Sequence, residues 1–387
     1  MDKVILLVRT LMSWDADGEE IPAPTRTDPV LDAWRSRWRA TAELRPTRRR
    51  AVPRALASES SLALRAALHA MQAGELVLPP VRTGSVVAVA FSPDGALLAT
   101  ATASSATASR DGTVRLWDPV TRTPAGRPLT GHSGPVYAVA FSPGGTLLAT
   151  GGYDSTVRLW DPATRTAVGE PLTGHRQTVF AVVFSLDGTL LATASRDSTV
   201  RLWDPATRAP VGQPITGHGA AVHAVAFSPD GTLLATAGDD GTVRLWDLAT
   251  RAPVGQPITG HGAAVYAVAF SPDGTLLATA GDDGTVRLWD PATRTPAGPP
   301  LTGHSKPVYA VAFSPDGTLL ATASRDGTVR LWDPATRTPV RPPLTGHSKP
   351  VYAVAFSPDG TLLATASHAP SGDNDGTVQL WSVPDAG

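Results

Sequence analysis

Residues of four types that could act together in catalysis recur along the chain at constant spacing. One copy of this set comprises His132, Thr150, Asp154 and Trp160. A His between a carboxylate and a hydroxyl is the arrangement of a general base beside a nucleophile, so each copy could be a catalytic relay. However, the chain contains six copies, whereas catalysis requires only one. We therefore interpret the set as structural.

The set belongs to a longer sequence repeat. Arg-Leu-Trp-Asp recurs with its Trp every 43 residues from Trp117 to Trp332, and a seventh copy contains Trp381. Gly-His pairs recur with the same period, beginning at Gly131. Each unit contains three segments of strand-forming residues and a weaker fourth, separated by turn signals such as Ser-Pro-Asp-Gly. The pattern predicts an all-β protein built from repeated four-stranded units.

A 43-residue period with Gly-His and Trp-Asp signatures resembles the WD40 family, and the resemblance covers residues 75–386 in seven copies. It implies a seven-bladed β-propeller, expected over residues 75–387. It also implies that the repeated set is a buried hydrogen-bond network, in which Trp donates, Asp accepts and His bridges donor to acceptor. The residues expected to form it are His132, Thr150, Asp154, Trp160, His175, Asp197, Trp203, His218, Asp240, Trp246, His261, Asp283, Trp289, His304, Asp326, Trp332, His347, Asp375 and Trp381.

The two ends of the repeat region indicate how the ring would close. The last copy stops after its third strand, at Trp381. Residues 75–81 precede the first copy in the position of a fourth strand, so we expect them to complete the last blade and cover its free edge. The first copy keeps Thr100, Asp111 and Trp117 but has no Gly-His pair. Its network is therefore incomplete, and its blade is predicted to be the least stable.

The resemblance also implies a binding face at one rim of the ring. Two positions there contact ligands in the family: the residue after the first Val of the first strand, and the residue before the network Asp. Phe180 and all five Tyr occupy these positions, a composition typical of protein-binding surfaces. The first copy holds Val87 and Arg110, and the last copy holds Asn374 at the second position. Duplication of one repeat is the alternative explanation for the Tyr residues. The predicted partner-binding residues are Tyr137, Tyr153, Phe180, Arg196, His223, Asp239, Tyr266, Asp282, Tyr309, Arg325 and Tyr352.

Insertions and charged turns distinguish other parts of the ring. Residues 102–108 and 368–373 lengthen the same loop in the first and last copies, and this loop lies on the predicted binding rim. Residues 373–376 have part of the pattern of a calcium-binding loop but lack the remaining ligands, so no metal or other cofactor is expected. We interpret the turns of the opposite rim as a solvated face of alternating Asp and Arg, with a phosphate site as the alternative. Their Arg residues are Arg165, Arg208, Arg251, Arg294 and Arg337.

Residues 1–74 do not share the period and are predicted to form a helical extension. Leu31, Trp34 and Trp38 have helical spacing, and a second helix is expected over residues 60–73. We interpret the Arg-rich stretch over residues 35–54 as a solvated face and linker, with binding to nucleic acid or acidic lipid as the alternative. The extension resembles helical linkers that precede WD40 arrays in bacterial signalling proteins. This implies an alternative function, a sensor or regulatory module that docks onto a signalling ATPase or kinase through these helices.

Composition and missing motifs limit the remaining classes of function. The net charge is −1 and there is no Cys, so no general attraction to nucleic acid and no disulfide or thiolate chemistry is expected. No apolar run is long enough to span a membrane, and phosphate-binding loops, zinc motifs and nucleophile elbows are absent. We predict a cytoplasmic, monomeric, non-enzymatic scaffold that binds peptides or protein loops, without membrane or nucleic-acid partners. The bias toward Arg, Ala, Pro and Gly indicates a bacterial origin.

Overall fold

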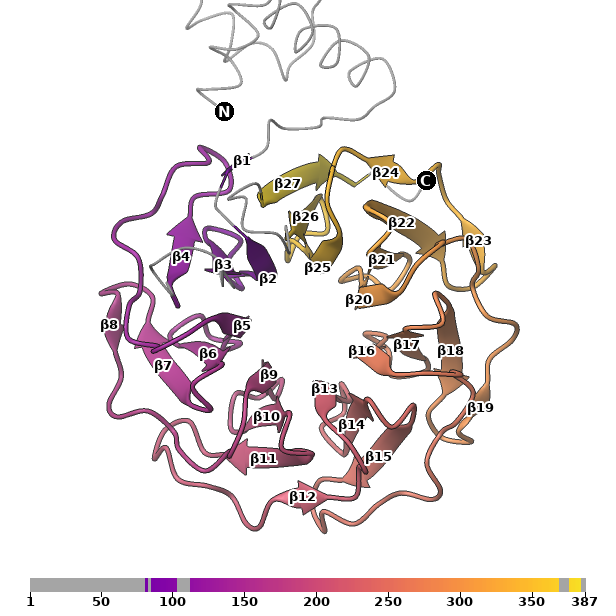
Figure 1. Cartoon of the computed structure of the whole chain (residues 1–387), viewed down its shortest axis with the longest axis horizontal. Helices are drawn as coiled ribbons and strands as arrows, with labels where there is room; N and C mark the ends of the chain where they lie inside the picture. The colour runs from indigo at the N-terminus through magenta and orange to yellow at the C-terminus, as the bar shows by residue number, and fades with distance from the viewer. Residues whose placement is uncertain (1–80, 83–84, 103–111, 369–375, 384–387) are drawn as a thin grey trace, which may run out of the picture. The chain divides into compact units, whose positions relative to one another are not determined.

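The computed structural model describes residues 81–82, 85–102, 112–368 and 376–383 of the chain. They form seven β-sheets, arranged as blades around a central axis (Figure 1). The predicted all-β, seven-bladed fold is confirmed for this part of the chain. The predicted helical extension, most of both insertions, and Arg110, Asp111, Asn374 and Asp375 lie outside the described residues. In the described ranges, no helix is long and apolar enough to cross a membrane.

The strands follow the order of the repeats. Blade 1 contains β2 (Val86–Phe91), β3 (Leu98–Thr102) and β4 (Val114–Trp117); blade 2 contains β5 (Val136–Phe141), β6 (Leu148–Gly152), β7 (Val157–Asp161) and β8 (Thr166–Ala167). Blade 3 contains β9 (Val179–Phe184), β10 (Leu191–Ser195), β11 (Thr199–Trp203) and β12 (Ile215–Thr216); blade 4 contains β13 (Val222–Phe227), β14 (Leu233–Gly238) and β15 (Val243–Asp247). Blade 5 contains β16 (Val265–Phe270), β17 (Leu277–Gly281), β18 (Val286–Asp290) and β19 (Thr295–Pro296). Blade 6 contains β20 (Val308–Phe313), β21 (Leu320–Ser324), β22 (Thr328–Asp333), β23 (Thr338–Pro339) and β24 (Leu344–Thr345).

Blade 7 combines the two ends of the propeller. It contains β25 (Val351–Phe356), β26 (Leu362–Ser367) and β27 (Thr377–Ser382), and its fourth strand is β1 (Val81–Arg82). Val81 pairs with Val378 and Arg82 with Thr377 in antiparallel register. The predicted closure by a strand from before the first copy is confirmed: Val81 belongs to the predicted segment 75–81, Arg82 extends the strand by one residue, and residues 75–80 lie outside the described residues. β1 covers the outer edge of β27 at Thr377 and Val378, so this part of the edge is not available for pairing with another chain.

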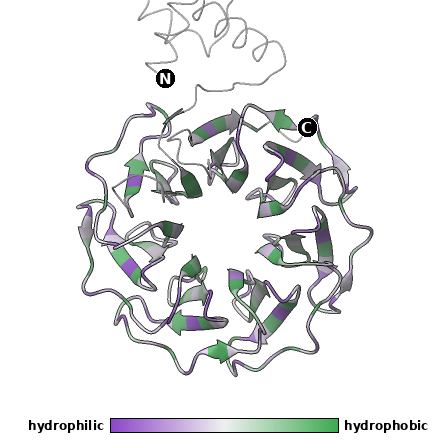
Figure 2. Ribbon diagram, viewed as in Figure 1, coloured by the Kyte–Doolittle hydropathy of each residue, from purple (hydrophilic) through white to green (hydrophobic). Residues whose placement is uncertain are grey.

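The hydrophobic core lies between neighbouring blades, and hydrophobic residues are accordingly distributed over every blade rather than gathered in one centre (Figure 2). Val157 and Leu159 of β7 pack in one cluster with Leu191 and Trp203 of blade 3. They alternate with the half-buried Arg158, because successive strand residues face opposite sides of a sheet. The second strands, such as β6, are buried along their whole length except at Leu233 of β14 and Leu362 of β26, and most of their residues are small. Small side chains there let adjacent sheets approach closely.

The fourth strands are short, and β8 shows why. Only Thr166 and Ala167 continue the ladder with β7, and Leu172 returns as an isolated pair with Val157. Between them, Gly169 has a φ of 70°, and Pro171 has no N–H to donate. In blades 1 to 6 the outer edge is therefore a loop held at two points rather than a continuous strand.

Candidate functional site: an aromatic rim

The repeated His, Thr, Asp and Trp form one connected hydrogen-bond network. In blade 2, Trp160 Nε1 donates to Thr150 Oγ1 (2.9 Å), which lies 2.7 Å from His132 Nε2. His132 Nδ1 lies 3.0 Å from Asp154 Oδ2, which also accepts the N–H of Ser133 at 3.0 Å. A neutral His that donates from Nδ1 to the carboxylate and accepts the Thr hydroxyl proton at Nε2 satisfies every member. The network thereby joins the loop before β5 to the loop before β7.

The same network recurs around the ring. His Nδ1 lies 2.9–3.1 Å from the carboxylate in the pairs His175–Asp197, His218–Asp240, His261–Asp283 and His304–Asp326. Donation to the Thr of the same blade, at 2.8–3.0 Å, is made by Trp203, Trp246, Trp289 and Trp332. In blade 7, Thr365 Oγ1 lies 2.7 Å from His347 Nε2 and accepts from Trp381 at 2.9 Å. In blade 1, Trp117 donates to Thr100 at 3.0 Å.

Burial makes the network a poor candidate for catalysis. Thr150, the would-be nucleophile, is 0% exposed, and the side chain of His132 is only 1% exposed, so a substrate has no access to either. Burial lowers the pKa of His347 to about 4, so that this ring is neutral at pH 7. Although burial raises the pKa of Asp326, hydrogen bonds to its carboxylate outweigh this effect and bring the pKa to about 2. The described geometry fits a structural role that fixes the rim loops.

A β-bulge near the start of each innermost strand creates the first rim position. In β5, Val136 pairs with Gly152 and Ala138 with Gly151, which leaves Tyr137 as the extra residue. The same register shift occurs in all seven blades. Val136 and Ala138 are buried, whereas Tyr137 is half-buried. Because a bulge redirects the side chain of its extra residue, the strand can fill the core and still present an aromatic ring at the rim.

Rings at this position in blades 2 to 7 contact one another from blade to blade, and Tyr352 also contacts His368 within blade 7. The centroid separations are 5.7 Å for Tyr137–Phe180, 4.7 Å for Phe180–His223, 5.2 Å for His223–Tyr266, 5.3 Å for Tyr266–Tyr309, 4.5 Å for Tyr309–Tyr352 and 5.4 Å for Tyr352–His368. These distances are typical of favourable aromatic contacts. We call these seven residues the aromatic rim. Blade 1 has Val87 at the first rim position, so the series begins at blade 2.

The second rim position follows the second strand of a blade. The backbone N–H of the residue at this position donates to the carbonyl of the residue before the first strand of the blade. In blade 6, for example, Arg325 donates to Pro307 (2.9 Å). The residues that make this bond are Tyr153, Arg196, Asp239, Asp282, Arg325 and His368. Sequence reasoning assigned Asn374 to blade 7 and missed His368. The sequence prediction took the residue before the network Asp, which in blade 7 lies on the far side of the insertion. The residue three positions after the network Thr365 is His368, and this spacing would have identified it.

The two rim positions are connected by polar contacts in blades 4 and 5. His223 Nε2 lies 2.7 Å from Asp239 Oδ1, and the Tyr266 hydroxyl donates to Asp282 Oδ1 at 3.3 Å. Burial, followed by the negative charge of Asp282, raises the pKa of Tyr266 to about 12. This hydroxyl therefore stays protonated near neutral pH and remains a donor. Elsewhere on the rim, Tyr153 is 57% exposed and free to meet a ligand.

The turns of the opposite rim contain Arg residues with an unusual backbone. Positive φ values of 59–64° occur at Arg165, Arg208, Arg251, Arg294 and Arg337. The guanidinium of Arg208 lies against Gly169 of the preceding blade, in the space that a Cβ would occupy, and the other four Arg side chains are placed likewise. These residues therefore help to hold neighbouring blades together, in addition to the solvated role that the sequence predicted. Within the described ranges, no group of His, Asp and Glu could hold a metal ion.

The fold and the rim define the class of protein, a seven-bladed β-propeller whose buried networks support an aromatic rim. The WD40 family model (WD domain, G-beta repeat) matches residues 79–118, 124–161, 166–204, 210–247, 253–290, 298–333 and 338–382. The chain belongs to the WD40 family. None of the curated proteins compared with the chain matches it. WD40 propellers are in general non-enzymatic scaffolds for protein interactions.

Proposed function

We propose that the chain is a non-enzymatic scaffold whose aromatic rim binds peptides or exposed loops of partner proteins. The observation that carries the proposal is the unbroken series of ring contacts from Tyr137 to His368. Adjacent rings restrain one another, so the rim loses little side-chain freedom when a ligand binds. Aromatic side chains are also the preferred anchors of protein interfaces.

Polar groups beside the rings would orient such a ligand. In blades 4 and 5, the carboxylates of Asp239 and Asp282 lie next to the rings of His223 and Tyr266. A peptide with a basic side chain beside an apolar one fits this sector, because the apolar group covers the rings while the cation meets the carboxylates.

Replacement of Tyr266 and Asp282 tests the proposal. Selection of a random displayed peptide library on the full-length protein supplies the ligands. Tyr266→Ala combined with Asp282→Ala should weaken their binding about thirtyfold, because truncation of a central aromatic anchor typically costs about 2 kcal/mol or more. Fluorescence anisotropy measures the affinity. The thermal unfolding midpoint should change little, since Tyr266 is only half-buried.

Leu186→Ala is the matched control on the opposite rim. Leu186 is 69% exposed in the turn between β9 and β10, at the far end of β9 from Phe180. Its truncation should leave peptide affinity unchanged. Arg208 is a less suitable control, because its side chain packs on the preceding blade. The proposal fails if the Tyr266 and Asp282 variant retains wild-type affinity for every selected peptide.

A further inference from the structure

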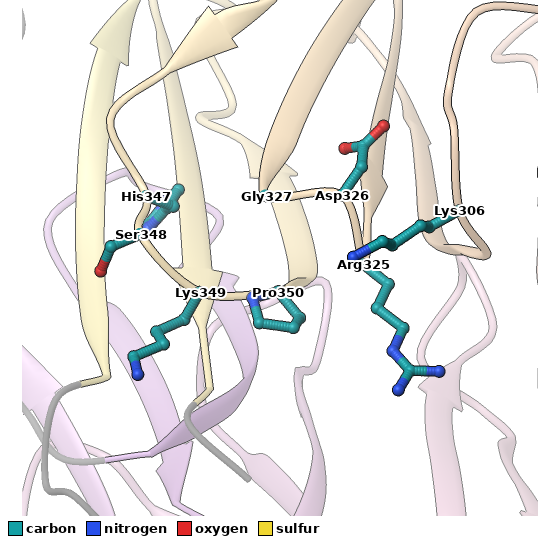
Figure 3. Close-up of a pocket in the computed structure, with 8 residues that line it drawn as sticks. All are labelled: Lys306, Arg325, Asp326, Gly327, His347, Ser348, Lys349 and Pro350. Carbon is teal, nitrogen blue, oxygen red and sulfur yellow. The ribbon is translucent and has the colours of Figure 1, made fainter. Parts of the chain in front are cut away.

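A cavity between blades 6 and 7 collects positive charge at the rim. Its volume is about 330 Å³, and it is lined by Lys306 together with residues 325–327 and 347–350 (Figure 3). The cavity brings Arg325 together with Lys306 and Lys349, two of the three Lys in the chain. It has room for a side chain rather than a large cofactor. We call it the blade 6–7 pocket.

The one carboxylate in the pocket lining is already engaged. Asp326 Oδ2 lies 3.0 Å from His304 Nδ1 and accepts the N–H of Ser305 at 3.1 Å, while Oδ1 accepts the Thr328 hydroxyl at 2.7 Å. Its side chain is only 9% exposed. Figure 3 shows it pointing away from the side chain of Arg325. Asp326 therefore belongs to the buried network, and among the described lining residues its single negative charge offsets only part of the charge of Lys306, Arg325 and Lys349.

The three cations have no carboxylate partner in the part of the chain that the structure describes. Lys306, Arg325 and Lys349 form no ion pair with a described residue, whereas Asp239 on the same rim pairs with His223 at 2.7 Å. Figure 3 shows Arg325 and Lys349 extending in a similar direction, with Lys306 reaching toward Arg325. Like charges repel one another, so a bound anion would reduce the repulsion among the three cations.

The equivalent site between blades 4 and 5 shows that folding does not require these cations. The positions of Lys306, Arg325 and Lys349 are occupied there by Ala220, Asp239 and Ala263. Both sites keep the same buried network, with His Nδ1 to Asp distances of 2.9 Å and 3.0 Å. The three cations of the blade 6–7 pocket are therefore surface residues that the buried network does not need.

The loops that line the pocket lead directly into the strands that carry two rings of the aromatic rim, because Lys306 and Lys349 lie three residues before Tyr309 and Tyr352. Tyr309 of blade 6 and Tyr352 of blade 7 stack with centroids 4.5 Å apart and planes inclined by 10°. Burial raises the pKa of Tyr352 to about 12, and the charge of Arg325 acts in the opposite direction on the same hydroxyl. The backbone N–H of Arg325 donates to the carbonyl of Pro307 (2.9 Å), two residues before Tyr309, so Arg325 and the stacked rings lie within reach of one peptide ligand.

We infer that the blade 6–7 pocket binds an anionic oxygen group, a carboxylate or a phosphate, on a side chain of a peptide that lies on the aromatic rim. This inference rests on the proposed function of the rim. The guanidinium of Arg325 offers a planar pair of N–H donors to such a group, and the two Lys ammonium groups add point charges. The stacked Tyr309 and Tyr352 hold the adjoining apolar part of the peptide. If the same peptide also reached blades 4 and 5, a basic side chain of the peptide would face Asp239 and Asp282 there.

Selection of a random displayed peptide library on the full-length protein tests the inference. The wild-type protein should enrich peptides that contain Asp or Glu. The variant Lys306→Ala, Arg325→Asp, Lys349→Ala recreates the side chains that the blade 4–5 site already accommodates. It should keep the wild-type unfolding midpoint and lose the enrichment of acidic peptides.

Synthetic peptides then distinguish the source of the anion. One enriched peptide is made with Glu, phosphoserine or Gln at the enriched position, and fluorescence anisotropy measures the affinity of each form. The Glu and phosphoserine forms should bind about tenfold more tightly than the Gln form, because several partly exposed charge pairs act together. The difference should shrink as the salt concentration rises. Tighter binding of phosphoserine than of Glu assigns the pocket to phosphate, and the reverse order assigns it to carboxylate.

The outcomes separate this inference from the proposed function. If the wild type enriches peptides without an acidic excess, and Tyr266→Ala still weakens their binding, the rim function stands and the inference about the pocket is overturned. Retention of the acidic preference by the triple variant overturns it as well. If no selected peptide depends on the rim, both proposals fail.

Discussion

Blades 4 and 5 and blades 6 and 7 are built on one plan but present opposite charges. The first pair carries Asp239 and Asp282 on its rim, and the second carries Lys306, Arg325 and Lys349. Blades 4 and 6, one from each pair, have the same register shift in their first two strands and nearly the same distances in their buried networks. The comparison shows that this repeat separates two roles. Buried positions define the scaffold, and rim positions vary without disturbing it.

One structural difference accompanies the change of charge. In blade 6, Ser324 Oγ donates to the carbonyl of Pro307 at 2.9 Å. Blade 5 has Gly281 at this position, where a Cβ would lie 2.6 Å from the carbonyl oxygen of Ala264. The Lys-Pro loop therefore leaves room for a hydroxyl that the Ala-Ala loop excludes. The loop sequence and the last residue of the second strand depend on each other.

The largest expected effect on stability comes from removing the closing strand β1. This strand belongs to blade 7, so blades 4 and 5 have no equivalent of it. Deletion of residues 1–82 removes β1 and frees the outer edge of β27 in blade 7. We expect aggregation in size-exclusion chromatography, because an unpaired strand edge recruits other chains. Hydrogen exchange should accelerate in β25–β27 more than in β13–β15.

Deletion of residues 1–70 is the control, because it leaves β1 in place. This shorter truncation should elute as the full-length protein does. Identical elution of both truncated proteins would show that β1 does not stabilise the ring.

Replacing a His of the buried network should have a smaller effect on stability, and the effect should be equal in blade 4 and in blade 6. His218→Ala and His304→Ala each remove the bridge between a Thr and an Asp. Each should lower the free energy of unfolding by about 1–3 kcal/mol, since the buried partners lose a hydrogen bond. Urea denaturation measures the loss. A large loss in one sector with none in the other would contradict the view that the scaffold is shared.

The smallest effect is a dependence on pH. Burial lowers the pKa of His218, His261 and His304, and brings that of His347 from the usual 6.5 to about 4. Between these values the unfolded chain binds more protons than the folded chain, so stability falls as the pH is lowered from about 6.5 to about 4. The unfolding midpoint should therefore decrease between about pH 7 and pH 5, with hydrogen exchange increasing first in blade 7. A constant or rising midpoint would refute the neutral state of these His residues.

Much of the fold and part of the site could be predicted from the sequence. The period places Trp160 and its equivalents on strands, and hydrogen-bonding capacity explains why His132 would join Thr150 to Asp154. The rim residue Tyr137 was assigned from the family pattern, but the sequence contains no sign of the bulge that redirects it. His368 was missed because the insertion after it breaks the spacing used to find its equivalents.

The sequence by itself determined the number of blades, the closing strand and the composition of each network, because these depend on local strand and turn patterns repeated at a constant period. Only the tertiary structure decided that the rim rings form one continuous series, that His368 extends it, and that Lys306, Arg325 and Lys349 share a pocket. The physical reason is that these arrangements arise between blades. Residues that are distant in the chain meet only after neighbouring sheets have packed, and their separations depend on that packing.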